Sequence, residues 1–291
     1  MKIAAVVVTF NRKEYLVKNI EALLAQVNAP MDILIIDNAS TDGTEEAIRH
    51  YIDAGQIHYE NTGENLGGAG GFNFGIRRAY EAGYDAIWIM DDDTYPHPDA
   101  LEKFLQADKD LNGMYGYLAG KVLWKDGSWC EMNTPKYKGG MAEGKYKQIV
   151  QSSFVSMFIP RKSVATYGLP IKEFFIWGDD VEYTRRIALR EPSYLVEDSQ
   201  VLHDTKNNVG SNIVYDDERI DRYRYAYRNE MYIALHEGWK RRVYQQLKIW
   251  YHIAKILLKS SQKKRKIRLI LSASKEGKTF NPSIEYISDE R

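Results

Sequence analysis

The sequence predicts an α/β fold in which a mostly parallel sheet carries helices on its faces. Two observations indicate it. Short apolar runs alternate with segments of helical periodicity through the first hundred residues. Polar and small residues directly follow those runs, where a strand would end and a turn would begin. The 291 residues are 44% hydrophobic and 12% aromatic, which suffices for a real core and excludes wholesale disorder.

The apolar pattern predicts individual strands and helices along the chain. The β-branched run of residues 3–9 and the run of residues 32–37 predict buried strands, and the apolar spacing over 16–27 predicts a helix between them. The segment 115–160 is rich in Gly, Tyr and short strand-like runs, so helix is not expected there. Further strands are expected at 57–60, 86–90 and 194–197, and further helices from 44 to 51, at 71–82, at 181–189 and over most of the chain beyond 215.

Charge divides the chain into two parts. The 40 basic and 40 acidic residues cancel, yet residues 239–275 contain twelve Lys or Arg and no Asp or Glu. This asymmetry predicts an acidic body over residues 1–237 and a basic amphipathic helical tail over 238–291.

Cysteine content and hydropathy indicate the cellular compartment. The lone Cys130 excludes an internal disulfide and a cysteine-rich zinc site. No apolar run reaches about 18 residues, and the apolar N-terminal run is too short for the core of a signal peptide. We therefore expect a cytoplasmic protein.

Three consecutive aspartates, Asp91 to Asp93, directly follow the predicted strand at 86–90. In open α/β sheets, ligands collect at the carboxyl ends of the strands. Neighbouring carboxylates repel one another unless a cation lies among them, and alternate acids such as Asp91 and Asp93 suit Mg²⁺ or Mn²⁺ and, through the metal, a diphosphate. The alternative is a solvated acidic turn that caps the next helix.

Polar residues also follow the first two strands: Thr9, Asn11 and Arg12 after one, Asp37 and Asn38 after the other. Short polar side chains at such a rim can contact a nucleobase and ribose, and Arg12 can meet a phosphate. Ordinary turn and cap chemistry is the alternative.

The segment from Asn65 to Phe72 contains four glycines, among them Gly68. Glycine lets a backbone approach a ligand closely, and the helix start that follows favours anions. If Gly68 and Gly70 were the first two glycines of the dinucleotide fingerprint, Asn73 would stand in place of the third. That mismatch argues against a dinucleotide-dependent dehydrogenase.

Two adjacent acids, Asp179 and Asp180, stand at a predicted helix start behind an aromatic run that ends in Trp177. An acid beside an aromatic ring could act as a base next to a stacked sugar, although helix capping is the alternative. His203 follows a predicted strand and precedes the polar segment 204–212, so it is a candidate third metal ligand or a structural histidine.

Taken in order, these segments resemble the GT-A-fold glycosyltransferases of family 2, in particular the galactofuranosyl- and rhamnosyltransferase-like branch. VVVTFNRKEYL, IIDNASTDGT, ENLGGAGGFNFGI, MDDDT and FFIWGDDVEYTRR occur in the family's order between Val6 and about His236. The resemblance implies a Rossmann-like nucleotide-binding sheet, with residues 1–115 holding the nucleotide sugar and residues 116–237 the acceptor.

Position by position, the resemblance implies that Asp91, Asp93 and His203 bind Mn²⁺ or Mg²⁺. Asp180 is implied as the catalytic base. Asp179 is expected to contact the acceptor, as is Trp177 from its aromatic face. Together with the strand-end pattern, the resemblance gives as expected nucleotide-sugar contacts Thr9, Asn11, Arg12, Asp37, Asn38, Asn65, Gly68 and Asp92.

The implied reaction is a single, inverting displacement in which an acceptor hydroxyl loses its proton to Asp180, while the metal and Arg12 stabilise the leaving diphosphate. The expected donor is UDP-galactofuranose, with dTDP-rhamnose as the alternative. The expected acceptor is a glycan or lipid-linked saccharide of cell-surface polysaccharide synthesis. Two other classes are a nucleotidyltransferase, disfavoured because residues 9–15 contain no glycine, and a non-catalytic nucleotide-sugar sensor, disfavoured by the presence of Asp180 with the metal set.

The basic tail has an apolar helical face flanked by lysines. This pattern predicts peripheral contact with the anionic inner face of the cell membrane. The alternative is packing on the body or on a second subunit of a homo-oligomer. Nucleic acid is not expected because base-stacking motifs are absent. The face consists of Val243, Leu247, Trp250, Ala254 and Leu257.

Overall fold

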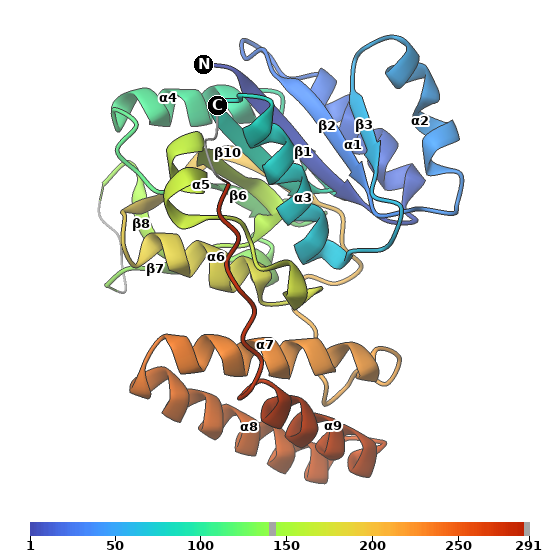
Figure 1. The fold of residues 1–291 in the computed structure, drawn as a ribbon, viewed down its shortest axis with the longest axis vertical. Coiled ribbons are helices and arrows are strands. Elements are labelled where there is room, and N and C mark those ends of the chain that lie inside the picture. Colours follow the sequence, from blue (N-terminus) through green and yellow to red (C-terminus); the bar gives the residue numbers. More distant parts are fainter. Residues whose placement is uncertain (140–143, 288–291) are drawn as a thin grey trace.

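The computed structural model describes residues 1–139 and 144–287, which form an α/β body above a layer of helices (Figure 1). One sheet runs through the described body in the order β3–β2–β1–β4–β9–β6–β10–β8–β7, with β5 paired to β10. The strands are β1 (Ile3–Thr9), β2 (Asp32–Asp37), β3 (His58–Asn61), β4 (Ala86–Asp91), β5 (Thr94–Pro96), β6 (Leu118–Leu123), β7 (Lys136–Tyr137), β8 (Lys147–Gln151), β9 (Met157–Pro160) and β10 (Ser193–His203).

Helices cover both faces of this sheet and form the layer beneath it (Figure 1). Helix α3 begins within the glycine-rich segment, four residues before the predicted start at 71, and β10 is longer than the predicted strand at 194–197. The helices are α1 (Lys13–Leu24), α2 (Thr44–Asp53), α3 (Gly67–Glu81), α4 (Ala100–Asp110), α5 (Arg161–Tyr167), α6 (Asp179–Ala188), α7 (Tyr223–His236), α8 (Trp239–Lys259) and α9 (Lys263–Glu276).

The sheet is parallel in its first part and mixed as a whole. Strands β3, β2, β1 and β4 run parallel, as predicted, so their polar carboxyl ends meet at one edge. Strand β9 is antiparallel to both β4 and β6, and β10 is parallel to β6 but antiparallel to β5 and β8. The short runs at 115–160 supply β6, β7, β8 and β9, whose direction the apolar pattern could not indicate.

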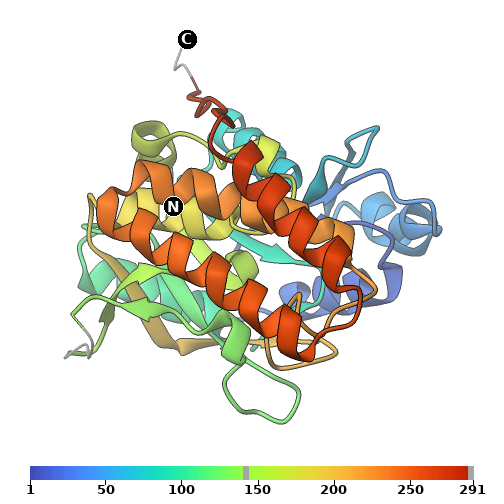
Figure 2. The ribbon, with the colours of Figure 1, turned by 90° about the horizontal axis from the view of Figure 1, so that it is seen from below.

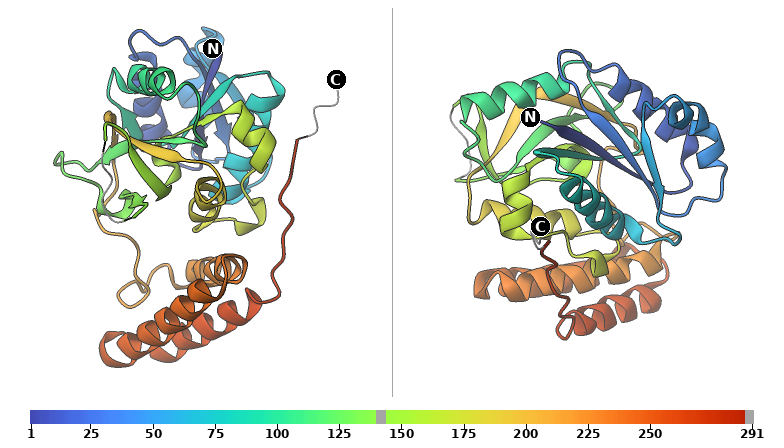
Figure 3. Two further views of the ribbon diagram at one scale, coloured as in Figure 1. Left: turned by 90° about the vertical axis from the view of Figure 1, so that its left-hand side faces the viewer. Right: turned by 45° about the horizontal axis from the view of Figure 1, so that its top comes forward.

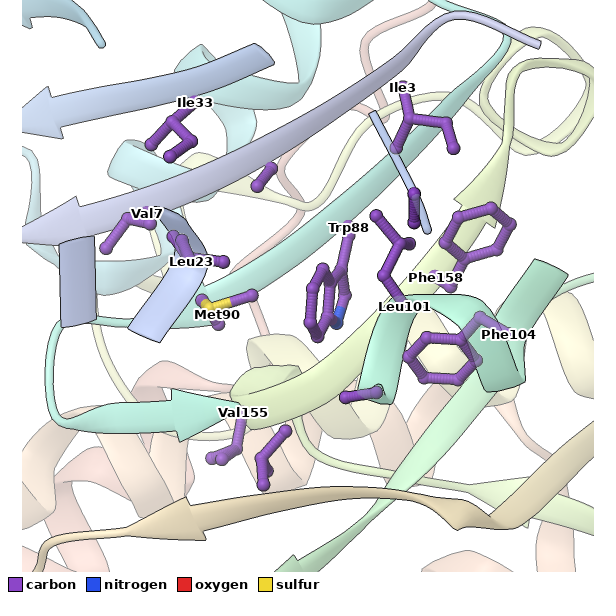
Figure 4. Close-up of a cluster of buried hydrophobic side chains, with 14 of the residues drawn as sticks. Ile3, Val7, Leu23, Ile33, Trp88, Met90, Leu101, Phe104, Val155 and Phe158 are labelled. Carbon is purple, nitrogen blue, oxygen red and sulfur yellow. The ribbon is translucent and has the colours of Figure 1, made fainter. Parts of the chain in front are cut away.

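Alternation along β1 produces two cores, because successive strand residues point to opposite faces. Odd-numbered residues from Ile3 to Val7 pack against α1, α2 and α4, and even-numbered residues from Ala4 to Val8 pack against α3, α5 and α6. Figure 4 shows the first core around Trp88, whose ring lies edge-on to Phe104 with centroids 5.9 Å apart. The buried indole Nε1 donates to Ser156 Oγ at 3.1 Å, so the ring leaves no polar atom unpaired.

Glycines let α3 lie close against β1. A Cβ atom at Gly71 would come within 2.5 Å of Val8 Cγ1, and one at Gly75 within 2.4 Å of Val6 Cγ1. Any larger residue would push the helix away from the strand. Much of the glycine run therefore serves packing, whereas the sequence predicted that it approaches a ligand.

Helices α7, α8 and α9 form the layer under the body (Figures 2 and 3). Their shared core includes Tyr227, Met231, Ile249, Ile256 and Ile270. Helix α7 lies before the predicted boundary at residue 238 yet packs on both tail helices. No helix in the described residues has the length and apolar character needed to cross a membrane.

The end of the described chain returns to the body. The Glu285 carboxylate forms ion pairs with Arg77 at 3.0 Å and Lys172 at 2.6 Å, and it accepts a hydrogen bond from Asn73 at 3.0 Å. Its carbonyl accepts from the Leu169 amide at 2.9 Å. The tail is thus tied to the body at its far end as well as at its start.

Candidate active site

The carboxyl edge of the parallel strands and the start of α6 enclose a cavity of about 590 Å³. We call its two walls the strand-end side (Thr9, Arg12 and Asp91–Asp93) and the loop side (Phe175–Asp180). The structure brings most of the predicted site residues to this cavity, although they come from segments up to almost 200 residues apart. Those that line it are Thr9, Arg12, Asn38, Asn65, Gly68, Asp91, Asp92, Asp93, Trp177, Asp179, Asp180 and His203.

The strand-end side is a network of charges. Thr9 Oγ1 donates to Asp92 Oδ2 at 2.8 Å. Arg12 bridges two carboxylates, with Nε 3.3 Å from Asp92 Oδ1 and Nη2 2.7 Å from Asp93 Oδ2. Parallel pairing of β1 with both β2 and β4 sets these groups side by side. Arg12 is well placed to shift from these acids to an incoming phosphate, which also carries negative oxygens.

Asp91, Asp93 and His203 offer ligand atoms that all lie within 4.8 Å of one another, as a metal site requires. Asp93 Oδ1 is buried 3.2 Å from His203 Nε2 but has no hydrogen-bond partner of good geometry. A divalent cation would satisfy this orphaned oxygen. The two carboxylates of the donor set are ligands that suit Mn²⁺ or Mg²⁺.

Asn133 orients the His203 ring. Its Nδ2 donates to Ser153 Oγ at 3.0 Å, so its Oδ1 is left to accept the proton of His203 Nδ1 at 2.8 Å. If Nε2 gave up its proton to a bound metal, its lone pair would lie beside Asp93, which is the arrangement that metal-binding histidines have.

Burial and neighbouring charges shift the pKa values of the acids and of His203. Burial, reinforced by the charge of Asp93, raises the pKa of Asp91 to about 6, and burial raises the pKa of Asp92 to about 7. Burial alone would also raise the pKa of Asp93, but His203 and Arg12 outweigh it and hold that pKa below its usual value. Burial disfavours the charged form of His203, yet Asp93 and its neighbours raise its pKa to about 10. This site is built to hold positive charge.

Two predicted nucleotide contacts do not line the cavity. Asp37 is buried, and its carboxylate accepts hydrogen bonds from the Ser40 amide and the Tyr59 hydroxyl, both at 2.8 Å. Asn11 Oδ1 accepts from the Thr41 amide at 2.7 Å. Both residues therefore hold the turns behind the strand-end side.

The Asn65 turn and the start of α3 form the upper rim. Asn65 Oδ1 accepts from the Gly67 amide at 2.9 Å, and Asn38 Nδ2 donates to the Gly67 carbonyl at 2.9 Å. A Cβ at Gly67 would lie 2.2 Å from the Phe175 carbonyl oxygen, whereas one at Gly68 would meet nothing within 4 Å. Of these two glycines, only Gly68 leaves open space facing the cavity.

The loop side is irregular and strained. Phe175 and Trp177 have φ of 64° and 63°, a region that side-chain-bearing residues rarely adopt. Asn229 of α7 holds this segment, since its Nδ2 lies 3.0 Å from the Phe174 carbonyl and 2.8 Å from the Trp177 carbonyl. The strain is therefore held by a helix that comes about fifty residues later.

Asp179 and Asp180 begin α6 at the end of this segment. Burial, reinforced by the charge of Asp180, raises the pKa of Asp179 well above its usual value. Burial raises the pKa of Asp180 to about 6, and its Oδ1 accepts from the Val181 amide at 2.7 Å. A carboxylate with a pKa near neutrality in a cleft is suited to accept a proton.

Sequence reasoning missed two residues of the cavity, Asn133 and Arg222, but the segment 223–232 predicts that Arg228 and Asn229 brace the site, with an aromatic core helix as the alternative. Asn133 lies in an irregular segment with no periodic signal, and Arg222 lies in a stretch predicted to be helical. Asn229 lies beside Arg228, whose Nη2 donates to the Glu173 carbonyl at 2.6 Å. A polar Arg-Asn pair within an apolar helical face was the available signal for this brace.

Comparison with known proteins identifies the family to which the chain is similar. The model of the family described as Glycosyl transferase family 2 matches residues 4–160, which include the strand-end acids. Among curated relatives, the galactofuranosyltransferase GlfT1 of Mycobacterium tuberculosis is 27% identical over 269 residues, covering 83% of this chain and 85% of that protein. An undecaprenyl-phosphate mannosyltransferase of Micrococcus luteus is 32% identical over 112 residues, 37% of this chain and 44% of that protein.

Solved structures share the fold. TarS of S. aureus superposes with a TM-score of 0.59 at 14% identity, covering 96% of this chain and 44% of that chain. The mannosyltransferase PcManGT from Pyrobaculum calidifontis, in complex with GDP-Man and Mn²⁺, gives a TM-score of 0.56 at 14% identity, covering 97% of this chain and 76% of that chain. This chain thus spans less than half of TarS, and the likeness identifies its fold as GT-A.

Proposed function

We propose a specific reaction for this chain, which belongs to glycosyl transferase family 2. It transfers a sugar from a nucleotide-sugar donor to a saccharide acceptor in cell-surface polysaccharide synthesis, with inversion and with a divalent metal. The observation that carries this proposal is that Asp180 opens onto the same cavity as the metal-ligand set Asp91, Asp93 and His203.

The strand-end side would hold the donor. When bound, the metal supplies charge that binds and stabilises a leaving diphosphate. Asp91, Asp93 and His203 would hold it, and Arg12 would contact a phosphate oxygen. Asn38, Asn65 and Gly68 would position the rest of the nucleotide sugar.

The loop side would activate the acceptor. Asp180 would accept a proton from the attacking hydroxyl, and Asp179 would help hold the acceptor. Trp177 would offer its ring to a sugar, although that ring also packs on Tyr223 with centroids 5.0 Å apart. Attack from the face opposite the leaving diphosphate inverts the anomeric centre.

The proposed donor is UDP-galactofuranose. The relative GlfT1, which is named a galactofuranosyltransferase, matches 83% of this chain at 27% identity and supports this choice. Transfer of rhamnose from dTDP-rhamnose is the alternative. A non-catalytic nucleotide-sugar sensor or a nucleotidyltransferase would leave Asp180 without a role.

Thermal shift with UDP, dTDP and GDP, each with and without Mn²⁺, tests the donor proposal. We expect one nucleotide to raise the melting temperature only when Mn²⁺ is present, because binding to the folded state stabilises it by mass action. Asp93→Asn should lose that stabilisation, while the exposed Asp198→Asn should keep it. A protein that no nucleotide stabilises with either Mn²⁺ or Mg²⁺ contradicts the proposal.

Peripheral membrane contact through α8 is the second part of the proposal. Leu247, Trp250 and Leu257 are 64%, 62% and 54% exposed, whereas Ile249, Ile253 and Ile256 on another face are buried against α7 and α9. The helix thus has two apolar faces, of which only one is covered by other residues that the structure describes. Lysines flank the exposed face, which suits an anionic lipid surface.

Vesicle sedimentation tests this contact. The protein should sediment with phosphatidylglycerol vesicles, and Leu247→Glu with Trp250→Glu should abolish sedimentation. Leu189→Glu, which changes an exposed leucine of the body, is the matched control. Equal sedimentation of all three proteins would rule out α8 as the contact.

A further inference from the structure

A second cavity, of about 820 Å³, lies between the start of α7 and helix α9. Its lining is basic, and Asp221 is its acidic member among the residues that the structure describes. Tyr225 and Leu269 contribute apolar surface to its wall. The basic lining residues are Arg222, Arg224, Lys264, Arg265 and Arg268.

Among the described residues, three of these five cations have no acidic partner. Arg265 pairs with Asp221 at 2.8 Å, and Arg224 pairs with Glu276, outside the lining, at 2.9 Å. The exposed side chains of Arg222, Lys264 and Arg268 form no ion pair within the described part of the chain. Like charges gathered in a concave surface repel one another and focus a positive potential, so the cavity attracts anions. Guanidinium groups suit phosphate oxygens in particular.

This cavity adjoins the loop side of the active site. Arg222 lines both cavities. The Tyr225 ring, in the wall of the second cavity, stacks on Phe175 of the loop side with centroids 4.9 Å apart. An anion bound here would therefore lie beside the part of the active site that holds the proposed base, away from the strand-end acids.

We propose that the second cavity binds the phosphate or diphosphate group that links an acceptor saccharide to its hydrocarbon carrier. This inference rests on the proposed glycosyl transfer, because it assigns the acceptor's chemical class. Arg222, Lys264 and Arg268 bind the phosphate oxygens, and Tyr225 with Leu269 contacts the first carbons of the carrier. The saccharide then extends past Arg222 toward Asp180.

Calorimetric titration with geranyl diphosphate in EDTA tests this assignment. Without metal, the strand-end acids repel a diphosphate, so the titration measures the second cavity. The wild-type protein should bind, and Lys264→Gln with Arg268→Gln should weaken binding at least about 10-fold, because two charge-assisted contacts are lost. Lys275→Gln with Lys278→Gln removes two exposed cations outside the cavity and should leave binding unchanged.

Two further titrations identify the source of the phosphate. Inorganic diphosphate should bind more weakly than geranyl diphosphate and depend on the same two residues. Equal affinity of the three proteins for geranyl diphosphate, or binding to phosphatidylglycerol vesicles without binding to either diphosphate, overturns the proposal. Stabilisation by nucleotide and Mn²⁺ is read separately on the same variants, so a failed second cavity is distinguished from a failed donor site.

Discussion

The strand-end side holds its acids at the end of β4, beside the end of β1, and pairing of the two strands sets the spacing of Thr9 and Asp92. The loop side holds Asp179 and Asp180 after a segment with unfavourable backbone angles, which Asn229 of α7 fixes from outside. One wall is therefore supported by the regular sheet and the other by a tertiary contact. The two walls should therefore respond differently to mutation, and four experiments test this difference.

The largest effect is expected from Asp180→Asn. An amide cannot accept the proton, so kcat should fall about 10²–10⁴-fold, the usual contribution of a general base. Stabilisation by nucleotide and Mn²⁺ should persist because the strand-end side is untouched. Loss of nucleotide binding would show that Asp180 belongs to the donor site, and Asp198→Asn is the matched control.

Asn229→Ala should lower kcat about 10²-fold, because a base misplaced by about 1 Å loses that much. The freed carbonyls of Phe174 and Trp177 should also lower the free energy of unfolding by about 1–3 kcal/mol. Gln245→Ala removes another buried amide of the helical layer without contacting the loop side. If both variants lost stability alike and kcat stayed the same, the brace would be structural only.

Asn133→Ala should weaken Mn²⁺ affinity about 10–100-fold, as is typical of groups that orient a metal-binding histidine. Direct Mn²⁺ titration measures this, and kcat at saturating Mn²⁺ should recover. Exposed Asn61→Ala serves as the control. Unchanged affinity would remove His203 from the proposed metal set or show that its ring needs no support.

The smallest effect is expected from pH. Asp180 must be ionised to accept a proton, and burial raises its pKa to about 6. Activity should therefore be full above pH 6 and fall about tenfold for each pH unit below it, measured as kcat/KM at saturating Mn²⁺. Nucleotide stabilisation followed over the same range separates this loss from protonation of Asp91. A flat profile down to pH 5 would contradict the assignment of Asp180.

The same contrast explains what the sequence could predict. The bounds of β1 and β2 followed from apolar runs, and the meeting of Asp91, Asp93 and His203 was expected from the strand-end acids together with the family resemblance. The Arg228-Asn229 pair indicated a brace, but the carbonyl that Asn229 holds could not be predicted, because a hydrogen bond across 52 residues leaves no local pattern. The packing role of the glycine run could not be predicted, because the contact between Gly71 and Val8 exists only in the folded protein.

Helix α8 shows a further limit of sequence reasoning. Its periodicity contains two apolar stripes, and only the packing of α7 and α9 determines that Ile249 and Ile256 are covered while Leu247 and Trp250 are exposed. The predicted amphipathic face was real, but whether it faced solvent depended on elements outside the helix. Whether an apolar face of α8 is buried therefore depends on the helices that pack on it as well as on its own sequence.

The return of the C-terminal segment to the body matters for anyone engineering this protein. Truncation near residue 238 looks attractive as a way to a more soluble catalytic fragment. It would, however, remove Glu285 from between Arg77 and Lys172 and strip α7 of the two helices that cover it. Replacing the exposed Leu247 and Trp250 with polar residues in the intact chain is therefore the safer way to increase solubility.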